Sequence, residues 1–488
     1  MWALLGQRPF WPTTAPATTA QPSTQGDVLH ARPAVVNYGG SVGIVVFYGA
    51  VDGMPHAING NQTGSGAGGG LWSFVPEKVF GKLNRLRTNS PLIRLPTTTY
   101  LTATPRSDFI DGLIGMYLKT NASNGSDRGI IYVGMRRGGR QFYAFDVTSP
   151  TAPRFLRKKI GCAADAPLLG QAGSEPKIAC IRGNSTPVVI IDGGYAATAK
   201  DVGSRDVTTT GNAVYVLEAF TATVLKRFTA LSSGSISGSI GADVAERVYA
   251  VDLGAGGSID FETRGGGYGA SDWNIHEVAD LSGGTTPGRK CSFPPDVIVT
   301  RDFTAMTFGS GDHEKPPLST TDVHFSQILD RHLAASVPAN GSPSLWTDFH
   351  PVGAASDVSG SGCHMSLAQG EKGVNGSTSI VSLSYFGTNR PWPTSAGNVC
   401  SANLGFIKSY AMPLFCVAGD GSVLSGGGLC HRAWCRGWSR WPVPRRTKQV
   451  PFVIGARNPS GSAIQASRLR PSVNAPPLRR SWHQEVKR

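Results

Sequence analysis

The chain alternates short apolar runs with turns that are rich in glycine and aspartate. The clearest unit begins with an apolar strand at residues 45–50, turns at residues 51–53 and returns through a second strand that ends at Asn59. A further turn at residues 63–64 leads to a third strand at residues 71–76. Glycine accepts the positive φ that tight hairpin turns require, so this pattern predicts strand–turn–strand structure.

Similar units recur at intervals of tens of residues, with no helical period between them. A blade of a β-propeller takes roughly 40–50 residues, so the pattern predicts an all-β chain that forms a β-propeller of about seven irregular blades with insertions. One or two β-sandwiches are the alternative architecture, and their units would resemble one another less. The recurring units lie at residues 130–156, 188–225, 247–261, 296–311 and 379–387.

The two ends of the chain differ in composition from this repeating region. Residues 1–31 are rich in Pro, Thr, Ala and Gln, which predicts a disordered segment or linker. We expect the propeller to occupy residues 32–420 and an irregular Arg- and Pro-rich tail to occupy residues 421–488. No apolar run approaches the roughly 18 residues of a membrane-spanning helix, so the sequence predicts no transmembrane segment.

Composition and charge narrow the class of protein further. With 62 Gly, 33 Pro and only 16% charged residues, the chain suits short strands and tight turns better than long amphipathic helices. The formal net charge is +14, but residues 431–488 hold 13 Lys and Arg against one acid, Glu485. A nucleic-acid-binding domain would spread its positive charge over a folded face, so we expect a solvated basic tail and no nucleic-acid partner.

Long stretches of the repeating region resemble the C-terminal propeller of the PilC/PilY family, whose members are type IV pilus tip-associated adhesins and assembly factors. Any one blade motif is a weak signal, whereas several long motifs in the same order are specific. The stretches that carry the resemblance are residues 32–88 with GAVDGMPHAINGNQTG at their centre, IIYVGMRRGGRQFYAFDVTSPTAPRFL at 130–156, FGSGDHEKPPL at 308–318, YFGTNRP at 385–391, CSANLGFIKSYAMPLFC at 400–416, and a patch near 450–488.

The resemblance implies a function without bond chemistry. Propellers of this family support pilus assembly by opposing retraction, and the larger members display adhesive regions at the pilus tip. For this chain the resemblance implies partners among minor pilins at the tip, contacts with host-cell or abiotic surfaces, and a location on the pilus at the cell surface.

Many family members carry a von Willebrand A-type adhesive domain before the propeller. The propeller pattern of this chain begins within its first 40 residues, so we expect a truncated copy that lacks that adhesive domain. The first 25 residues lack a charged n-region and a continuous apolar h-region, so the sequence predicts no signal peptide within this chain.

Family propellers also carry a calcium loop with a DxDxDGxxD-like spacing, in which alternating carboxylates surround one hard cation. The corresponding stretch here, residues 235–247, retains only Asp243 and Glu246. Two carboxylates three positions apart cannot supply the roughly six to eight oxygen ligands of calcium. We therefore expect the loop to be deleted and the chain to bind no cofactor. The sequence Gly311-Asp-His-Glu314 could hold a metal only in principle, and we expect a turn there.

The eight cysteines contain no CxxC pair, which excludes zinc-ribbon and thioredoxin motifs. Cys400 and Cys416 flank a segment of the length of a hairpin. Two readings stay open for this pair: a disulfide formed in an oxidising compartment, or two free thiols.

The sequence motifs give little support to an enzymatic function. The chain has no GxxxxGK[ST] phosphate loop, no G-x-S-x-G nucleophile elbow and no H-E-x-x-H arrangement. The strongest enzymatic rival is a quinone-dependent dehydrogenase, because its blades share the strand–Gly-rich turn–strand pattern. The adjacent cysteines and the carboxylate set of such enzymes are absent, and fold resemblance alone is weak evidence for chemistry. We expect a protein that is not an enzyme.

A secreted binding propeller without any role in pili is the other alternative. Its contacts would come from exposed aromatic residues such as Trp72, Trp273 or Trp346. Tryptophans in such patterns more often pack in the core or between blades.

The composition changes abruptly between residues 429 and 446. Three Trp and two Cys lie there among arginines and fit no strand or helix pattern, whereas family-like sequence resumes at residues 450–455. A local disruption of the reading frame would explain this segment.

Overall fold

A computed structural model defines the fold over the repeating region. The chain divides into two compact units, Met1–Ile240 with Val251–His276, and Gly241–Ala250 with Glu277–Arg488. The structure describes residues 3–5, 26, 28, 30–88, 90–92, 104, 107–119, 128–160, 166–181, 184–196, 210–229, 247–252, 273–280, 291, 293, 295–299, 304–311, 324–330, 349–351, 362–380, 383–390, 406–414, 452–454 and 466–468.

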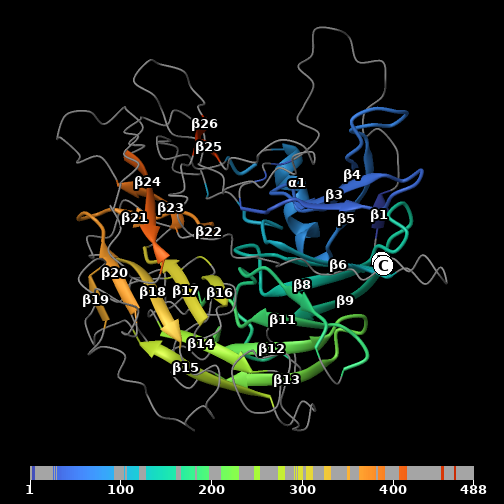
Figure 1. Cartoon of the computed structure of the whole chain (residues 1–488). Coiled ribbons are helices and arrows are strands. Elements are labelled where there is room, and N and C mark those ends of the chain that lie inside the picture. The colour runs from blue at the N-terminus through green and yellow to red at the C-terminus, as the bar shows by residue number, and fades with distance from the viewer. Residues whose placement is uncertain are drawn as a thin grey trace. The chain divides into compact units, whose positions relative to one another are not determined.

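Three antiparallel sheets of consecutive strands form the described body of the first unit (Figure 1). The first sheet contains β2 (Ala34–Asn37), β3 (Ile44–Gly49), β4 (Pro55–Asn59) and β5 (Gly70–Val75). The second contains β6 (Ile114–Lys119), β7 (Arg128–Gly134), β8 (Gln141–Asp146) and β9 (Arg154–Ile160). The third contains β10 (Lys177–Ala179), β11 (Val188–Asp192), β12 (Ala213–Glu218) and β13 (Val224–Thr229).

The second sheet is buried on both faces. On β7, Ile131 and Val133 pack towards the first sheet, while Ile130 and Tyr132 pack towards the third. Strand β8 alternates in the same way, with Tyr143 and Phe145 on one side and Phe142 and Ala144 on the other. Successive side chains of a strand point to opposite faces, so a sheet packed on both sides reads as a continuous apolar run. This explains why IIYV and FYAF contain no polar residue.

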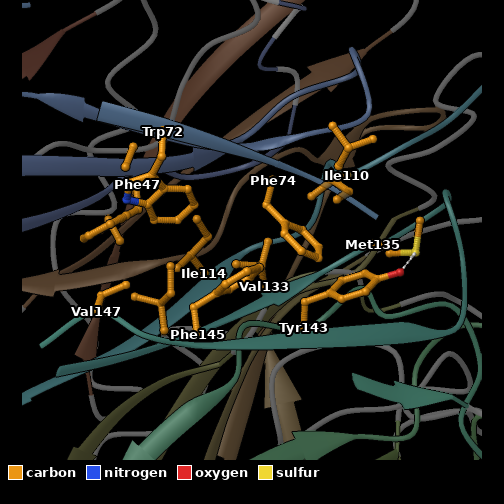
Figure 2. Close-up of a cluster of buried hydrophobic side chains, with 14 of the residues drawn as sticks. Phe47, Trp72, Phe74, Ile110, Ile114, Val133, Met135, Tyr143, Phe145 and Val147 are labelled. Atoms are coloured by element: carbon orange, nitrogen blue, oxygen red, sulfur yellow. Dashed lines mark hydrogen bonds between the residues drawn. The ribbon is translucent and has the colours of Figure 1, made fainter. Parts of the chain in front are cut away.

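Aromatic rings fill the space between the first two sheets, as Figure 2 shows. Phe74 of β5 meets Phe145 of β8 edge to face, with ring centroids 4.9 Å apart and planes at 76°. Such pairs contribute about 0.5–1.5 kcal/mol beyond the burial of their surface. The hydroxyl of Tyr143 lies 3.7 Å from the sulfur of Met135 at the edge of this cluster. The cluster therefore ties the two sheets together rather than filling one of them.

The first strands of the three sheets lie next to one another. Strand β2 packs against β6, and β6 packs against β10. Sheets that meet through their first strands and stack face to face have the arrangement of propeller blades. Strand β14 (Arg247–Asp252) pairs with β15 (Asn274–Asp280), and the division between the units falls within both strands.

The second unit contains two further sheets around their own core. The first has the order β16 (Asp296–Val299), β17 (Thr304–Gly309), β18 (His324–Asp330), β20 (Gly362–Ser366) and β19 (Phe349–Pro351). In the second, β23 (Leu383–Arg390) pairs with β21 (Lys372–Gly373), β22 (Thr378–Ile380) and β24 (Phe406–Pro413). Phe325 of β18 stacks on Phe386 of β23, with ring centroids 3.6 Å apart. Residues 452–454 (β25) and 466–468 (β26) form a separate pair of strands.

The expected fold class is confirmed: the chain is all-β and consists of consecutive antiparallel blade-like sheets. One short helical segment was not expected, because the sequence showed no helical period between its repeating strand–turn–strand segments. The turn η1 (Glu77–Val79) and the helix α1 (Phe80–Thr88) follow β5 directly. Val79 is buried and Leu83 packs against the same core as Phe74, so a few apolar residues fix this segment without a long helical period.

Part of the N-terminal segment that we expected to be disordered lies on the first sheet. Strand β1 (Ala3–Leu5) pairs antiparallel with the outer strand β5, with Leu4 opposite Phe74. Residues 26 and 30–31 hydrogen-bond to side chains of the first unit, whereas residues 6–25 lie outside the described residues. Most of the tail at 421–488, including the irregular segment 429–446, also lies outside them, so the domain boundaries stay predictions.

Two glycines mark where one blade approaches the next. A Cβ at Gly49, the last residue of β3, would lie 2.6 Å from the carbonyl oxygen of Ile110 in the connection to the second sheet. A Cβ at Gly134, the last residue of β7, would lie 2.8 Å from the carbonyl oxygen of Ala172 in the connection to the third. The same close approach thus repeats at the same place in two successive blades.

Replacing Gly49 by alanine should therefore destabilise the first unit by about 1–3 kcal/mol, because backbone would have to move to admit the methyl group. Gly70 offers a matched control, since a Cβ at this strand residue would meet no atom within 4 Å. Thermal unfolding followed by circular dichroism would measure both variants. Equal stability of Gly49→Ala and Gly70→Ala would contradict the close approach.

Candidate functional site

The candidate calcium, metal and disulfide residues singled out in the sequence lie outside the described residues. This holds for Asp243 and Glu246 of the expected calcium loop remnant, for residues 312–314, and for the pair Cys400 and Cys416. These expectations therefore stay predictions. Among the residues that the structure describes, no group of three or more His, Cys, Asp or Glu is arranged to hold a metal ion.

The described tryptophans are packed inside, as expected for residues between blades. Trp72 is 5% exposed and its indole N–H donates to the carbonyl oxygen of Pro150 at 2.8 Å, in the turn between β8 and β9. Trp273 is 2% exposed. Trp346 lies outside the described residues. Neither described tryptophan offers an exposed ring for a ligand.

A polar cluster in the described part of the first unit surrounds His56 on β4. Its Nε2 lies 2.8 Å from Oδ2 of Asp52, which sits in the turn between β3 and β4, and its Nδ1 lies 2.7 Å from Oγ of Ser73 on β5. The ring of Tyr48 stacks on the imidazole at a centroid distance of 5.0 Å. Strand pairing places these groups together, because His56 is directly opposite both Tyr48 and Ser73 in the sheet.

Asp52 also reaches the N-terminal segment. Its carboxylate accepts hydrogen bonds from the backbone N–H of Gly26 at 2.9 Å and of Met54 at 3.0 Å. A second aspartate acts on the same segment: Asp111, just before β6, accepts from the N–H of His30 at 2.8 Å and of Ala31 at 3.2 Å, and it bonds the His30 ring. The two carboxylates therefore hold Gly26, His30 and Ala31 against the first unit.

A Ser–His–Asp chain calls for comparison with the triad of serine hydrolases. In that triad the serine hydroxyl faces Nε2 and the aspartate holds Nδ1. In this chain the nitrogens are reversed, with Ser73 at Nδ1 and Asp52 at Nε2. His56 is 7% exposed, and Ser73 lies within a paired strand. The cluster fits an anchor for the chain segments around it.

Burial and hydrogen bonding have opposite effects on the pKa of Asp52 and of Asp111. Burial disfavours the ionised form of Asp52, but the hydrogen bond and charge of His56, with the N–H groups of Gly26 and Met54, lower its pKa below the usual value. At Asp111, burial is likewise outweighed by the bonds to His30 and the nearby charge of Arg136, so this pKa is lowered as well. Both groups therefore favour the folded state in their ionised form.

Asp192 at the end of β11 presents the opposite case. It is fully buried, and neither carboxylate oxygen has a hydrogen-bond partner. The hydroxyl of Ser174 and the N–H of Gly194 face the group, but burial outweighs them and raises the pKa of Asp192 well above its usual value. An isolated ionised carboxylate in such a place is costly, so the folded state favours the protonated acid.

Two features of the described surface and core were not anticipated. Val35 on β2 is 57% exposed and Met116 on β6 is 39% exposed, and these two strands pack side by side. In the second unit, Cys363 on β20 is fully buried and forms a disulfide whose partner lies outside the described residues. The positions of the eight cysteines in the sequence gave no signal for this bond.

Comparison with solved structures shows a likeness in fold. The chain is similar to the PilY1 C-terminal domain of Pseudomonas aeruginosa, with a TM-score of 0.50 and 16% sequence identity over 76% of this chain and 78% of that chain. The likeness shows the fold: a PilY1-like β-propeller. No protein-family model matches the chain. No curated protein matches it either.

Other solved structures match far less well. An α-L-arabinanase of Cellvibrio cellulosa has a TM-score of 0.27 and 12% identity over 61% of this chain and 90% of its own. The GH43 protein BlXynB of Bacillus licheniformis has a TM-score of 0.23 and 7% identity over 79% of this chain and 52% of its own.

In the described part of the chain, no helix is both long enough and apolar enough to cross a lipid bilayer.

The lowered pKa values predict how the first unit responds to acid. The two ionised carboxylates stabilise the folded state fully above the usual carboxyl pKa, and this stabilisation is lost as the pH falls through the lowered pKa values. Asp52→Asn and Asp111→Asn should therefore each reduce the free energy of unfolding at pH 7. Each variant should also lose less stability than the wild type as the pH falls below about pH 4. Urea unfolding between pH 2 and 7 would measure this. If the free energy of unfolding of both variants followed the wild-type pH profile, Asp52 and Asp111 would not act as anchors of the N-terminal segment.

Asp192→Asn should behave in the opposite way. Because its folded-state pKa is raised, the favourable contribution of Asp192 is present below the usual carboxyl pKa and is lost as the pH rises towards the folded value. The neutral amide should therefore stabilise the protein by about 1–3 kcal/mol at pH 8 and by less at pH 4. Urea unfolding at the two pH values measures the difference, and a loss of stability at pH 8 would show that Asp192 is ionised and paired.

Proposed function

We propose that this chain is a pilus-associated propeller of the PilC/PilY type that acts by contact, without bond chemistry. The observation that carries the proposal is the PilY1-like fold over 76% of the chain, together with sequence motifs that resemble the same family. In this role the propeller supports type IV pilus assembly by opposing retraction, and it contributes to adhesion at the cell surface. Its partners are minor pilins at the pilus tip, and no nucleic acid takes part.

The polar clusters of the first unit support a role without catalysis. His56 and His30 are both engaged by carboxylates that also bind backbone N–H groups, so these side chains join chain segments. A protein that works by contact needs rigid segments of this kind rather than a reacting group held near a substrate. No cofactor enters the proposal.

The disulfide at Cys363 supports an exported location. Disulfides form and persist in the periplasm and on cell surfaces and are rare in reducing compartments. Cys363 is fully buried in the core between the two main sheets of the second unit, where the bond adds stability to a protein exposed outside the cell.

Several apolar side chains are exposed on the described surface and are candidates for partner contact. Val35 and Met116 expose apolar side chains on β2 and β6, the neighbouring first strands of two blades. Single exposed apolar residues are common on protein surfaces, and strand alternation turns Val35 to the face of β2 opposite to Val36, so the two side chains are separate targets for substitution. We assign this pair to contact with the minor pilins.

A genetic test follows in the organism that encodes the chain. Deleting the gene should reduce surface pili and abolish twitching, and the wild-type gene should restore both. The double variant Val35→Lys, Met116→Lys should restore less than wild type, while a control at another exposed residue, Val42→Lys, should restore fully. Counts of sheared surface pili and twitching-zone diameters measure these effects, with thermal melting of the purified variants as the fold check.

Normal piliation and twitching in the deletion strain would refute the pilus role. Dye-linked dehydrogenase activity in the purified chain on addition of a quinone would refute the proposal that it acts without chemistry. Full restoration by the double variant would move the contact region away from β2 and β6 and leave the pilus role standing.

A further inference from the structure

Two histidines of the second unit lie side by side on one face of a sheet. His324 begins β18 and His364 lies in the middle of β20. The two strands are antiparallel neighbours (Figure 1). His364 is directly opposite Ser326, so His324 and His364 are diagonal neighbours on the same face. Their ring centroids are 4.7 Å apart and the ring planes meet at 33°.

This face is separate from the apolar core of the unit. The alternate residues of the same strands, Phe325 and Leu329 on β18 and Cys363 on β20, belong to the core that packs against the next sheet. The histidines point to the opposite face, and both are half-buried. Their placement therefore does not arise from filling that core.

The separation of the rings matches a chelate around one metal ion. Zinc binds imidazole nitrogen at about 2.0–2.1 Å, so a ring centre lies about 3.2 Å from the ion, and two ligands at about 90–110° then have ring centres about 4.5–5.2 Å apart. The observed 4.7 Å falls within this range. Imidazole suits zinc, copper and nickel, whereas calcium takes oxygen ligands.

The backbone of one ligand is held in place. Ser310, just after β17, donates its N–H to the carbonyl oxygen of His324 at 3.0 Å. Its hydroxyl also accepts from the N–H of His324 and donates to the same carbonyl oxygen, each at 3.0 Å. A fixed backbone reduces the entropy that a ligand side chain loses on binding a metal.

We propose that His324 and His364 form a binding site for a transition-metal ion of the zinc, copper and nickel class. The two imidazoles supply two coordination positions on the sheet face, and water or a partner's side chain takes the open positions. The site is independent of the calcium loop expected from the sequence and does not depend on the proposed pilus function.

Zinc titration of the full chain by calorimetry tests the site. One zinc ion should bind to the wild type, and the variants His324→Gln and His364→Gln should each weaken this binding at least tenfold. His431→Gln in the basic tail is the matched control and should bind as the wild type does. Thermal melting with zinc should raise the unfolding temperature of the wild type and of the control, but not of the two site variants.

Pulsed EPR of the wild type with one equivalent of Cu²⁺ tests the geometry without any substitution. Two coordinated imidazoles should appear in the nitrogen modulation of the spectrum. A single imidazole, or unchanged zinc affinity in either site variant, would overturn the proposal. If a site variant does not fold, the number of imidazoles in the wild-type spectrum decides the question.

Discussion

The structure depends on each inner sheet burying both of its faces. The second sheet of the first unit has no polar position on the central residues of β7 and β8, because their alternate side chains enter two different clusters. Such a sheet has no face left for water and is stable only between neighbours. The polar atoms of the large side chains also bond to a neighbouring sheet. The indole N–H of Trp72 in the first sheet donates to the carbonyl oxygen of Pro150, next to the second sheet. The hydroxyl of Tyr132 in the second sheet donates to the carbonyl oxygen of Ala219, next to the third.

Burial on both faces also explains which strands could be predicted from the sequence. The runs at 130–133, 142–145 and 188–191 contain only apolar and aromatic residues, so their strands were identified in place. The first strands β6 and β10 were missed, because each has exposed or half-buried positions that break the apolar run. The helix α1 was missed since its nine residues contribute little burial of their own.

The polar clusters were beyond sequence reasoning for a different reason. Asp52 and His56 are four residues apart across a turn, and an aspartate in a glycine turn followed by a strand histidine is a signal that could have been used. The link between His30 and Asp111 spans 81 positions and depends on the docking of the N-terminal segment, which no local pattern encodes. The pair His324 and His364 likewise follows from strand order, because 40 positions and another strand, β19, separate them in sequence.

The distribution of these polar groups bears on how such a fold can carry function. A blade that is apolar on both faces leaves only its turns, its first strand and the outermost sheet faces for polar chemistry. In the first unit Asp52 and Asp111, which lie in the connections between strands, hold Gly26 and His30. In the second unit His324 and His364 lie on the sheet face opposite to Phe325 and Cys363, a face on which Ser326 of β18 is itself buried. The carboxylates that hold the chain together and the histidine pair of the proposed metal site therefore lie on different elements of the fold.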